Sequence, residues 1–134
     1  MRQKINRLLL ASVTLGIIAL TLAPVSGSDV TQPSFLSPLL HFTGYFLLAG
    51  ALMLEFHDTG KGRHEALAAA AVFGAAMELL QFHLPYRHFS LYDLAVNTLG
   101  ASTVLLDHRL GFVTKTIRFE DRTIEKLVSG YDHF

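Results

Sequence analysis

Four runs of apolar residues, separated by short polar stretches, dominate the first 106 residues of the chain. They cover residues 8–28, 36–54, 66–82 and 91–106. The first run carries no ionisable side chain, and the other three carry one each: His41, Glu78 and Asp93. Because a bilayer-spanning helix needs roughly 17–25 mainly apolar residues, the pattern predicts four transmembrane helices, at about residues 6–25, 36–55, 65–83 and 90–106.

Composition supports this prediction. Of the 134 residues, 51% are hydrophobic and only 16% are charged, and the mean hydropathy is +0.39. A soluble helical bundle is the rival interpretation, but a soluble helix needs a polar face, and the first two runs have almost none. We therefore expect an all-α, integral membrane four-helix bundle over residues 1–106, with a cytoplasmic tail at 107–134 whose spaced apolar residues allow an amphipathic helix.

Charge and cysteine content exclude several classes of function. The chain has no cysteine, which excludes a disulfide scaffold and thiolate chemistry. Its formal net charge is zero, so nucleic acid is not an expected partner. The sequence has no His-x-x-x-His pair, and although His41, Glu78, Asp93 and a loop histidine are conceivable ligands, we predict neither a metal site nor a cofactor.

The distribution of Lys and Arg predicts how the helices cross the membrane. The N-terminal arm, the loop after the second run and the tail contain ten of the eleven Lys and Arg residues, and the remaining one, Arg87, lies in the loop after the third run. Cytoplasmic loops are enriched in Lys and Arg, so both termini are expected in the cytoplasm of a multi-pass cell-membrane protein. The first run also resembles a signal peptide, but its apolar core exceeds the usual ~7–15 residues, and we interpret it as an uncleaved helix.

Polar residues interrupt the third and fourth runs close to the predicted outer face. Glu78 and Gln81 are three residues apart, and Asp93 and Asn97 are four apart, so each pair lies on one side of its helix. His41 enters from the second helix at a similar depth. Together with Arg87 and Ser90 of the connecting loop, we expect these side chains to meet in one polar patch at the outer face.

Several members of this patch have ordinary structural explanations. Ser90 and Asp93 fit a capping box at the start of the fourth helix, and Gln81 and Asn97 can join helices by hydrogen bonds. Glu78 is harder to explain, because a carboxylate inside a membrane helix costs on the order of 2–3 kcal/mol. Pairing of Arg87 with Glu78 or Asp93 would offset that cost. Small residues let membrane helices approach closely, and we expect such close contacts at Gly44, Gly74 and Gly100.

The order and spacing of these residues resemble the VanZ-like family of small integral membrane proteins. The resemblance rests on Glu78-x-x-Gln81, Pro85-x-Arg87, Ser90-x-x-Asp93 and Asn97-x-x-Gly100, preceded by His41, and it covers roughly residues 41–106. Family members often carry an acidic residue and a lysine shortly before the histidine, and this chain has neither. The family is associated with low-level teicoplanin resistance. The resemblance implies a membrane location and the polar patch, but little chemistry.

Three hypotheses for the patch follow. In the first, the chain is an accessory or binding protein for an anionic lipid-linked or glycan precursor of the cell envelope, with Gln81, Arg87, Ser90 and Asn97 as ligand-binding residues. Arginine suits phosphate because its guanidinium donates as a planar fork. In the second, the chain is an intramembrane hydrolase or transferase with Glu78 as general base and His41 or Asp93 as its partner. In the third, the polar residues lock the bundle or join a membrane protein partner.

Overall fold

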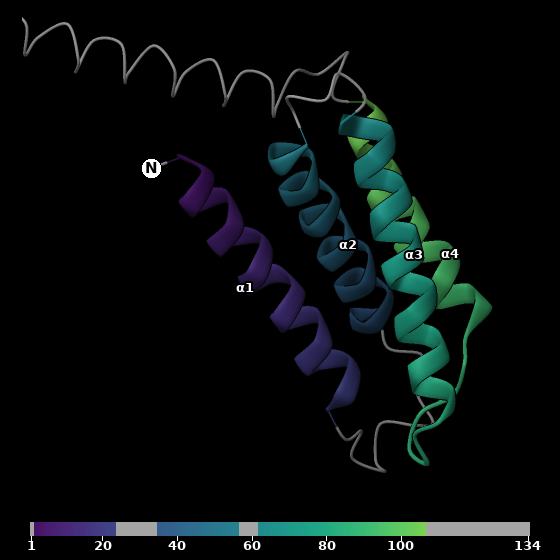
Figure 1. Cartoon of the computed structure of the whole chain (residues 1–134). Coiled ribbons are helices and arrows are strands. Elements are labelled where there is room, and N and C mark those ends of the chain that lie inside the picture. Colours follow the sequence, from purple (N-terminus) through teal and green to yellow (C-terminus); the bar gives the residue numbers. More distant parts are fainter. Residues whose placement is uncertain (1, 24–34, 57–61, 107–134) are drawn as a thin grey trace, which may run out of the picture.

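The computed structural model describes residues 2–23, 35–56 and 62–106, and these residues form helices joined by short connections (Figure 1). They contain no strand, so the predicted all-α class is confirmed. The predicted bounds of the second helix are met to the residue, and those of the others lie within a few residues. The helices are α1 (Arg2–Leu22), α2 (Leu36–Glu55), α3 (Gly62–Phe82) and α4 (Leu91–Ser102), which continues into the 3₁₀ helix η2 (Thr103–Leu106).

Local sequence explains where the helices begin and end. α1 ends two residues before Pro24, whose ring disfavours a helical conformation in the residue that precedes it. Pro38 lies in the first turn of α2, where a missing N–H costs no intrahelical bond. α4 begins after Ser90, which has an extended backbone and whose side-chain oxygen accepts a hydrogen bond from the backbone N–H of Asp93 at 3.1 Å. The predicted cap of α4 is therefore confirmed.

α2 lies between α1 on one side and the pair α3 and α4 on the other (Figure 1). It packs against all three helices, whereas α1 packs mainly on α2 and only slightly on α3. Most buried apolar residues belong to α2, α3 and α4, and α1 contributes Ile17 alone. The core is thus formed by three helices, and α1 lies at its side.

Glycine allows α2 and α4 to approach closely. A Cβ atom added to Gly100 would lie 2.4 Å from the backbone oxygen of Phe42, and one added to Gly74 would lie 3.0 Å from the Tyr45 ring. The predicted packing role is confirmed at these two positions. At Gly44 the nearest atom would be 3.5 Å away, which is an ordinary contact that does not require glycine.

Three helices are long and apolar enough to cross a membrane: the segment Gln3–Leu22 of α1, all of α2 and all of α3. α4 with η2 is shorter, at 91–106. Large apolar side chains cover the outside of the helices, among them Leu8, Leu15 and Val72, each about two-thirds exposed or more. Such a surface is stable in lipid and costly in water. The predicted tail, 107–134, lies outside the described residues.

α1 is fastened to α2 at the end where α1 begins and α2 ends. The side-chain amide of Asn6 donates to the Leu54 carbonyl at 3.3 Å, and Arg7 forms an ion pair with Glu55 at 3.1 Å. Along the rest of its length, α1 contacts the core through few buried side chains. The contacts at the two ends of α1 therefore largely determine where α1 lies.

Candidate polar site at the loop end

The predicted site residues gather at one end of the helices, which we call the loop end. Residues 83–90 connect α3 to α4 there, α1 ends there and α2 begins there (Figure 1). The seven residues, hereafter the loop-end cluster, come from α2, α3, α4 and the α3–α4 loop: His41, Glu78, Gln81, Arg87, Ser90, Asp93 and Asn97.

Glu78 lies at the centre of the loop-end cluster. Its side chain is only 1% exposed, and its Oε2 atom accepts a hydrogen bond from the backbone N–H of Ser90 at 3.1 Å. In a capping box, the acidic residue of the helix itself would accept this bond. The sequence assigned that role to Asp93, but Glu78 of α3 takes it. Glu78 thereby fixes the start of α4 against the end of α3.

A second polar contact joins α2 to α4. The Nδ1 atom of His41 and the Oδ1 atom of Asn97 lie 2.9 Å apart, and Asn97 is 2% exposed. On α3, Gln81 is 4% exposed and lies on the same face as Glu78. The predicted convergence of α2, α3 and α4 through polar side chains is therefore present in the structure.

The charges of the cluster are close enough to act on one another. Glu78 is attracted by His41 and Arg87 and repelled by Asp93. These three side chains are partly exposed, as is Ser90, whereas Glu78 is buried behind them. The cluster thus has a buried acidic centre and a partly exposed rim, and we use the name rim for His41, Arg87, Ser90 and Asp93.

Arg87 does not form the ion pair that the sequence suggested. Within the described residues, no ion pair joins it to Glu78 or Asp93. Its Nη2 atom donates instead to the carbonyl of Leu20 in the last turn of α1 and to that of Ala23, the residue after α1, at 3.0 Å each. The last carbonyls of a helix lack intrahelical donors, and a cation is favoured at that end of the helix dipole. The unpaired carbonyls and the dipole of α1 therefore explain why Arg87 points toward the end of α1.

The α3–α4 loop holds the end of α1 by a further bond, from the Tyr86 hydroxyl to the Leu22 carbonyl at 3.1 Å. Arg87 is not fully satisfied by its contacts, because its Nε atom is buried and has no hydrogen-bond partner among the residues that the structure describes. An unpaired buried donor costs about 1–3 kcal/mol. The guanidinium therefore retains unused capacity to donate a hydrogen bond.

Sequence reasoning missed Tyr45. Its side chain is 3% exposed, packs over Gly74 and lies close enough to Glu78 for the Glu78 charge to act on it. The available signal was its spacing, because Tyr45 follows His41 by four residues and therefore shares its helix face. The polar interior of the bundle extends through Tyr45 one turn deeper than the loop-end cluster.

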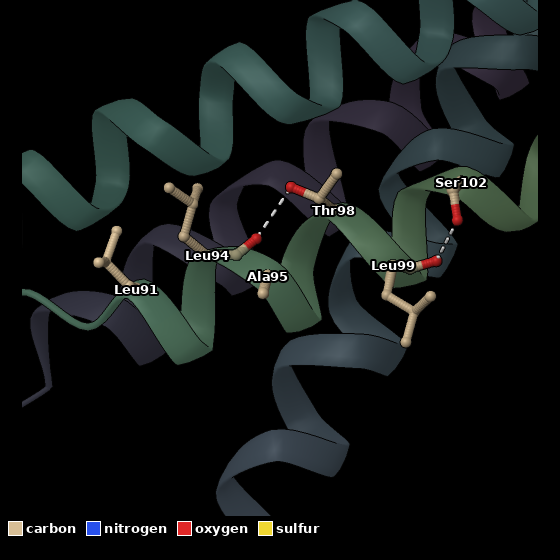
Figure 2. Close-up of a pocket in the computed structure, with 6 residues that line it drawn as sticks. All are labelled: Leu91, Leu94, Ala95, Thr98, Leu99 and Ser102. Carbon is tan, nitrogen blue, oxygen red and sulfur yellow. Dashed lines mark hydrogen bonds between the residues drawn. The ribbon is translucent and has the colours of Figure 1, made fainter.

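Three residues of the loop-end cluster are shielded from the surroundings. Glu78, Gln81 and Asn97 are all buried. An open groove of about 460 Å³ runs along α4, lined by Leu91, Leu94, Ala95, Thr98, Leu99 and Ser102 (Figure 2). Helical spacing puts these residues on the face of α4 opposite Asp93 and Asn97. The hydroxyls of Thr98 and Ser102 donate to the carbonyls of Leu94 and Leu99, at 2.9 and 2.7 Å.

The described residues contain no group of three or more His, Cys, Asp or Glu side chains that could hold a metal ion. The described residues thus form an all-helical protein with helices apolar enough to cross a membrane, and seven of its polar side chains meet at the loop end. Comparisons with the models of known protein families, with curated proteins and with solved structures found no match.

Proposed function

We propose that the chain is a VanZ-like protein of the cell membrane that binds an anionic, lipid-linked or glycan ligand of the cell envelope as an accessory or binding protein. The observation that carries this proposal is the rim over buried Glu78. Ionisable residues inside membrane helices are costly, and they usually pair and serve a function. Here two acidic side chains, a histidine and an arginine from four different segments converge at one helix end.

The proposed orientation places the loop end outside the cell and both termini in the cytoplasm. All four helices then cross the bilayer, with the shorter α4 reaching from the outer interface. Lys4, Arg7 and Arg63 lie at the opposite end of the helices from Arg87. This distribution agrees with the enrichment of Lys and Arg in cytoplasmic loops, and it presents the rim to envelope precursors.

The rim offers two kinds of contact to such a ligand. Arg87 is the only Lys or Arg among the described residues of the loop end, so it is the group for a phosphate or carboxylate. Asp93, Ser90 and His41 can exchange hydrogen bonds with hydroxyl groups, which a glycan carries in number. A lipid-linked sugar phosphate satisfies both kinds of contact, because its phosphate is anionic and its sugar carries hydroxyl groups.

Binding can be tested with purified protein in nanodiscs and a polyprenyl phosphate sugar as the probe. Arg87→Gln is expected to weaken binding by at least about tenfold, since a charge-assisted bond is worth about 1.5–3 kcal/mol. Arg63→Gln, at the opposite end, is the matched control and should bind like the natural protein. Equal affinities of all three proteins, or no binding by any of them, would contradict the proposal.

A second candidate function is structural, and the internal bonding of the cluster favours it. Glu78 bonds to the start of α4, His41 pairs with Asn97 and Arg87 caps α1. These contacts would lock the bundle without any ligand, for use as a membrane subunit beside a protein partner. Under this alternative, Arg87→Gln lowers stability in detergent and leaves no binding activity to lose.

The enzymatic alternative requires a substrate to reach Glu78 as general base, and this side chain is 1% exposed. It therefore demands an opening movement at the loop end. Release of phosphate or transfer of a group from the same probe would support it, provided that Glu78→Gln abolishes turnover and retains binding.

A further inference from the structure

One element of the fold has the features of a movable strap, namely the last turn of α1. Its carbonyls are held by two side chains of the α3–α4 loop, through the bonds of Arg87 to Leu20 and Ala23 and the bond of Tyr86 to Leu22. α1 is also the least buried of the long helices: only 11% of its apolar span is buried, compared with 28% for α2 and for α3, and near its loop end it buries just Ile17 and Thr21. Its loop end therefore depends on these few polar bonds.

Arg87 is needed in two places at once. In this structure its Nη2 atom donates to neutral carbonyl oxygens at the end of α1. The anionic group of the proposed ligand would accept hydrogen bonds from the same guanidinium. A phosphate or carboxylate adds the attraction of opposite charges and can accept two parallel bonds from the guanidinium, which a neutral carbonyl oxygen cannot do. An anionic group at the rim would therefore compete successfully with the end of α1 for Arg87.

The buried Nε atom of Arg87 adds to this competition. It has no hydrogen-bond partner among the described residues while the guanidinium donates to the end of α1. A phosphate or carboxylate accepts from two nitrogens of the planar fork together. Turning toward an anion would thus satisfy a donor that the present arrangement leaves unpaired.

We infer that Arg87 and Tyr86 form a latch on α1, and that binding of an anionic lipid headgroup to Arg87 releases the loop end of α1. This inference rests on the proposed function, because it adds a conformational response to the same binding event. The opposite end of α1 should stay in place, since the Arg7–Glu55 ion pair and the Asn6 bond are remote from the rim. By linkage, weakening the latch must strengthen ligand binding.

Spin-label distances can measure this release, because the chain has no cysteine of its own. The pair Leu22→Cys and Phe82→Cys reports on the loop end, where both side chains are exposed. The pair Ile5→Cys and His64→Cys reports on the opposite end as the matched control. Distances are recorded in phosphatidylcholine nanodiscs with polyprenyl phosphate, and with polyprenyl alcohol as the probe that lacks the charge.

We expect polyprenyl phosphate to shift the loop-end pair to longer distances and to leave the opposite pair unchanged, with no effect of the alcohol. Adding Arg87→Gln should lengthen the loop-end distance without any probe. Tyr86→Phe removes one bond of the latch but keeps Arg87, so it should tighten binding of polyprenyl phosphate by about two- to tenfold. A residue with a merely structural role would not tighten binding when removed.

The possible failures are distinguishable when binding is measured in the same samples. If polyprenyl phosphate binds while the loop-end distance stays constant, or if Tyr86→Phe weakens binding, the latch is refuted and the proposed function survives. If polyprenyl phosphate neither binds nor changes the distance, the latch is refuted, and the binding of the polyprenyl phosphate sugar decides separately whether the proposed function stands.

Discussion

Replacing Gly100 by alanine should separate α4 from α2, because the new methyl group would meet backbone rather than a side chain. The added Cβ would lie 2.4 Å from the Phe42 oxygen, 3.1 Å from its carbonyl carbon and 3.2 Å from its Cα. A side chain could rotate away from such a contact, but the backbone of α2 cannot. We therefore expect α4 to shift, which also strains the neighbouring bond between His41 and Asn97.

Two opposing effects determine how much Gly100→Ala lowers the free energy of unfolding. Overpacking a well-packed interior costs typically 1–3 kcal/mol, and the rigid contact at Gly100 favours the upper half of that range. Alanine recovers up to ~1 kcal/mol because it loses less backbone entropy in a helix than glycine does. The net expectation is a loss of about 1–2 kcal/mol in the free energy of unfolding.

Unfolding by SDS in mixed micelles, followed by circular dichroism, measures this loss. Gly50→Ala is the matched control, since a Cβ at Gly50 meets nothing within 4 Å and the same gain in helix propensity should leave stability unchanged or slightly higher. If Gly100→Ala proves as stable as Gly50→Ala, the close approach of α2 and α4 at Phe42 is not present in the protein.

The same unfolding assay tests three further contacts. Ser90→Ala should cost about 1 kcal/mol through loss of the α4 cap, and Ser90→Asp should retain most of the stability; equal losses would contradict the cap. A double-mutant cycle of His41→Ala and Asn97→Ala should give a coupling energy of about 0.6–1.7 kcal/mol, and no coupling would rule out their bond. Glu78→Gln keeps an acceptor for the Ser90 N–H, so it should be more stable than Glu78→Leu, by about 1–3 kcal/mol; the reverse order would refute the Glu78–Ser90 contact.

The parts of this structure that could be predicted from sequence are those set by spacing along one helix. Apolar runs indicated α2 at its observed bounds, and intervals of three and four residues indicated that Glu78 and Asn97 would face the same interior. The glycine at position 100 was assigned to close packing on the same grounds. Each of these inferences uses only neighbours in the chain and the geometry of a helix.

The remaining features depend on which segments meet in space. Arg87 bonds to α1, more than sixty residues away in sequence, and no local pattern indicates that α1 ends beside the α3–α4 loop. For the same reason, no local pattern indicates that Glu78 of α3, rather than Asp93, accepts the hydrogen bond from the Ser90 N–H. Burial also depends on the meeting of separate segments: Glu78, Gln81 and Asn97 are each at most 4% exposed, which spacing along one helix does not indicate. Tyr45 differs from these features because its position can be inferred from sequence. It follows His41 by four residues and therefore lies on the same face of α2.

The central claim is that the loop-end cluster faces the outside of the cell, and a labelling experiment tests it most directly. Because the chain has no cysteine, His88→Cys in the α3–α4 loop and His64→Cys at the opposite end each provide a single thiol at an exposed position. With a maleimide that cannot cross membranes, we predict that His88→Cys reacts in intact cells and that His64→Cys reacts only after lysis. Labelling of His64→Cys in intact cells, with His88→Cys protected until lysis, would place the cluster in the cytoplasm and contradict the account.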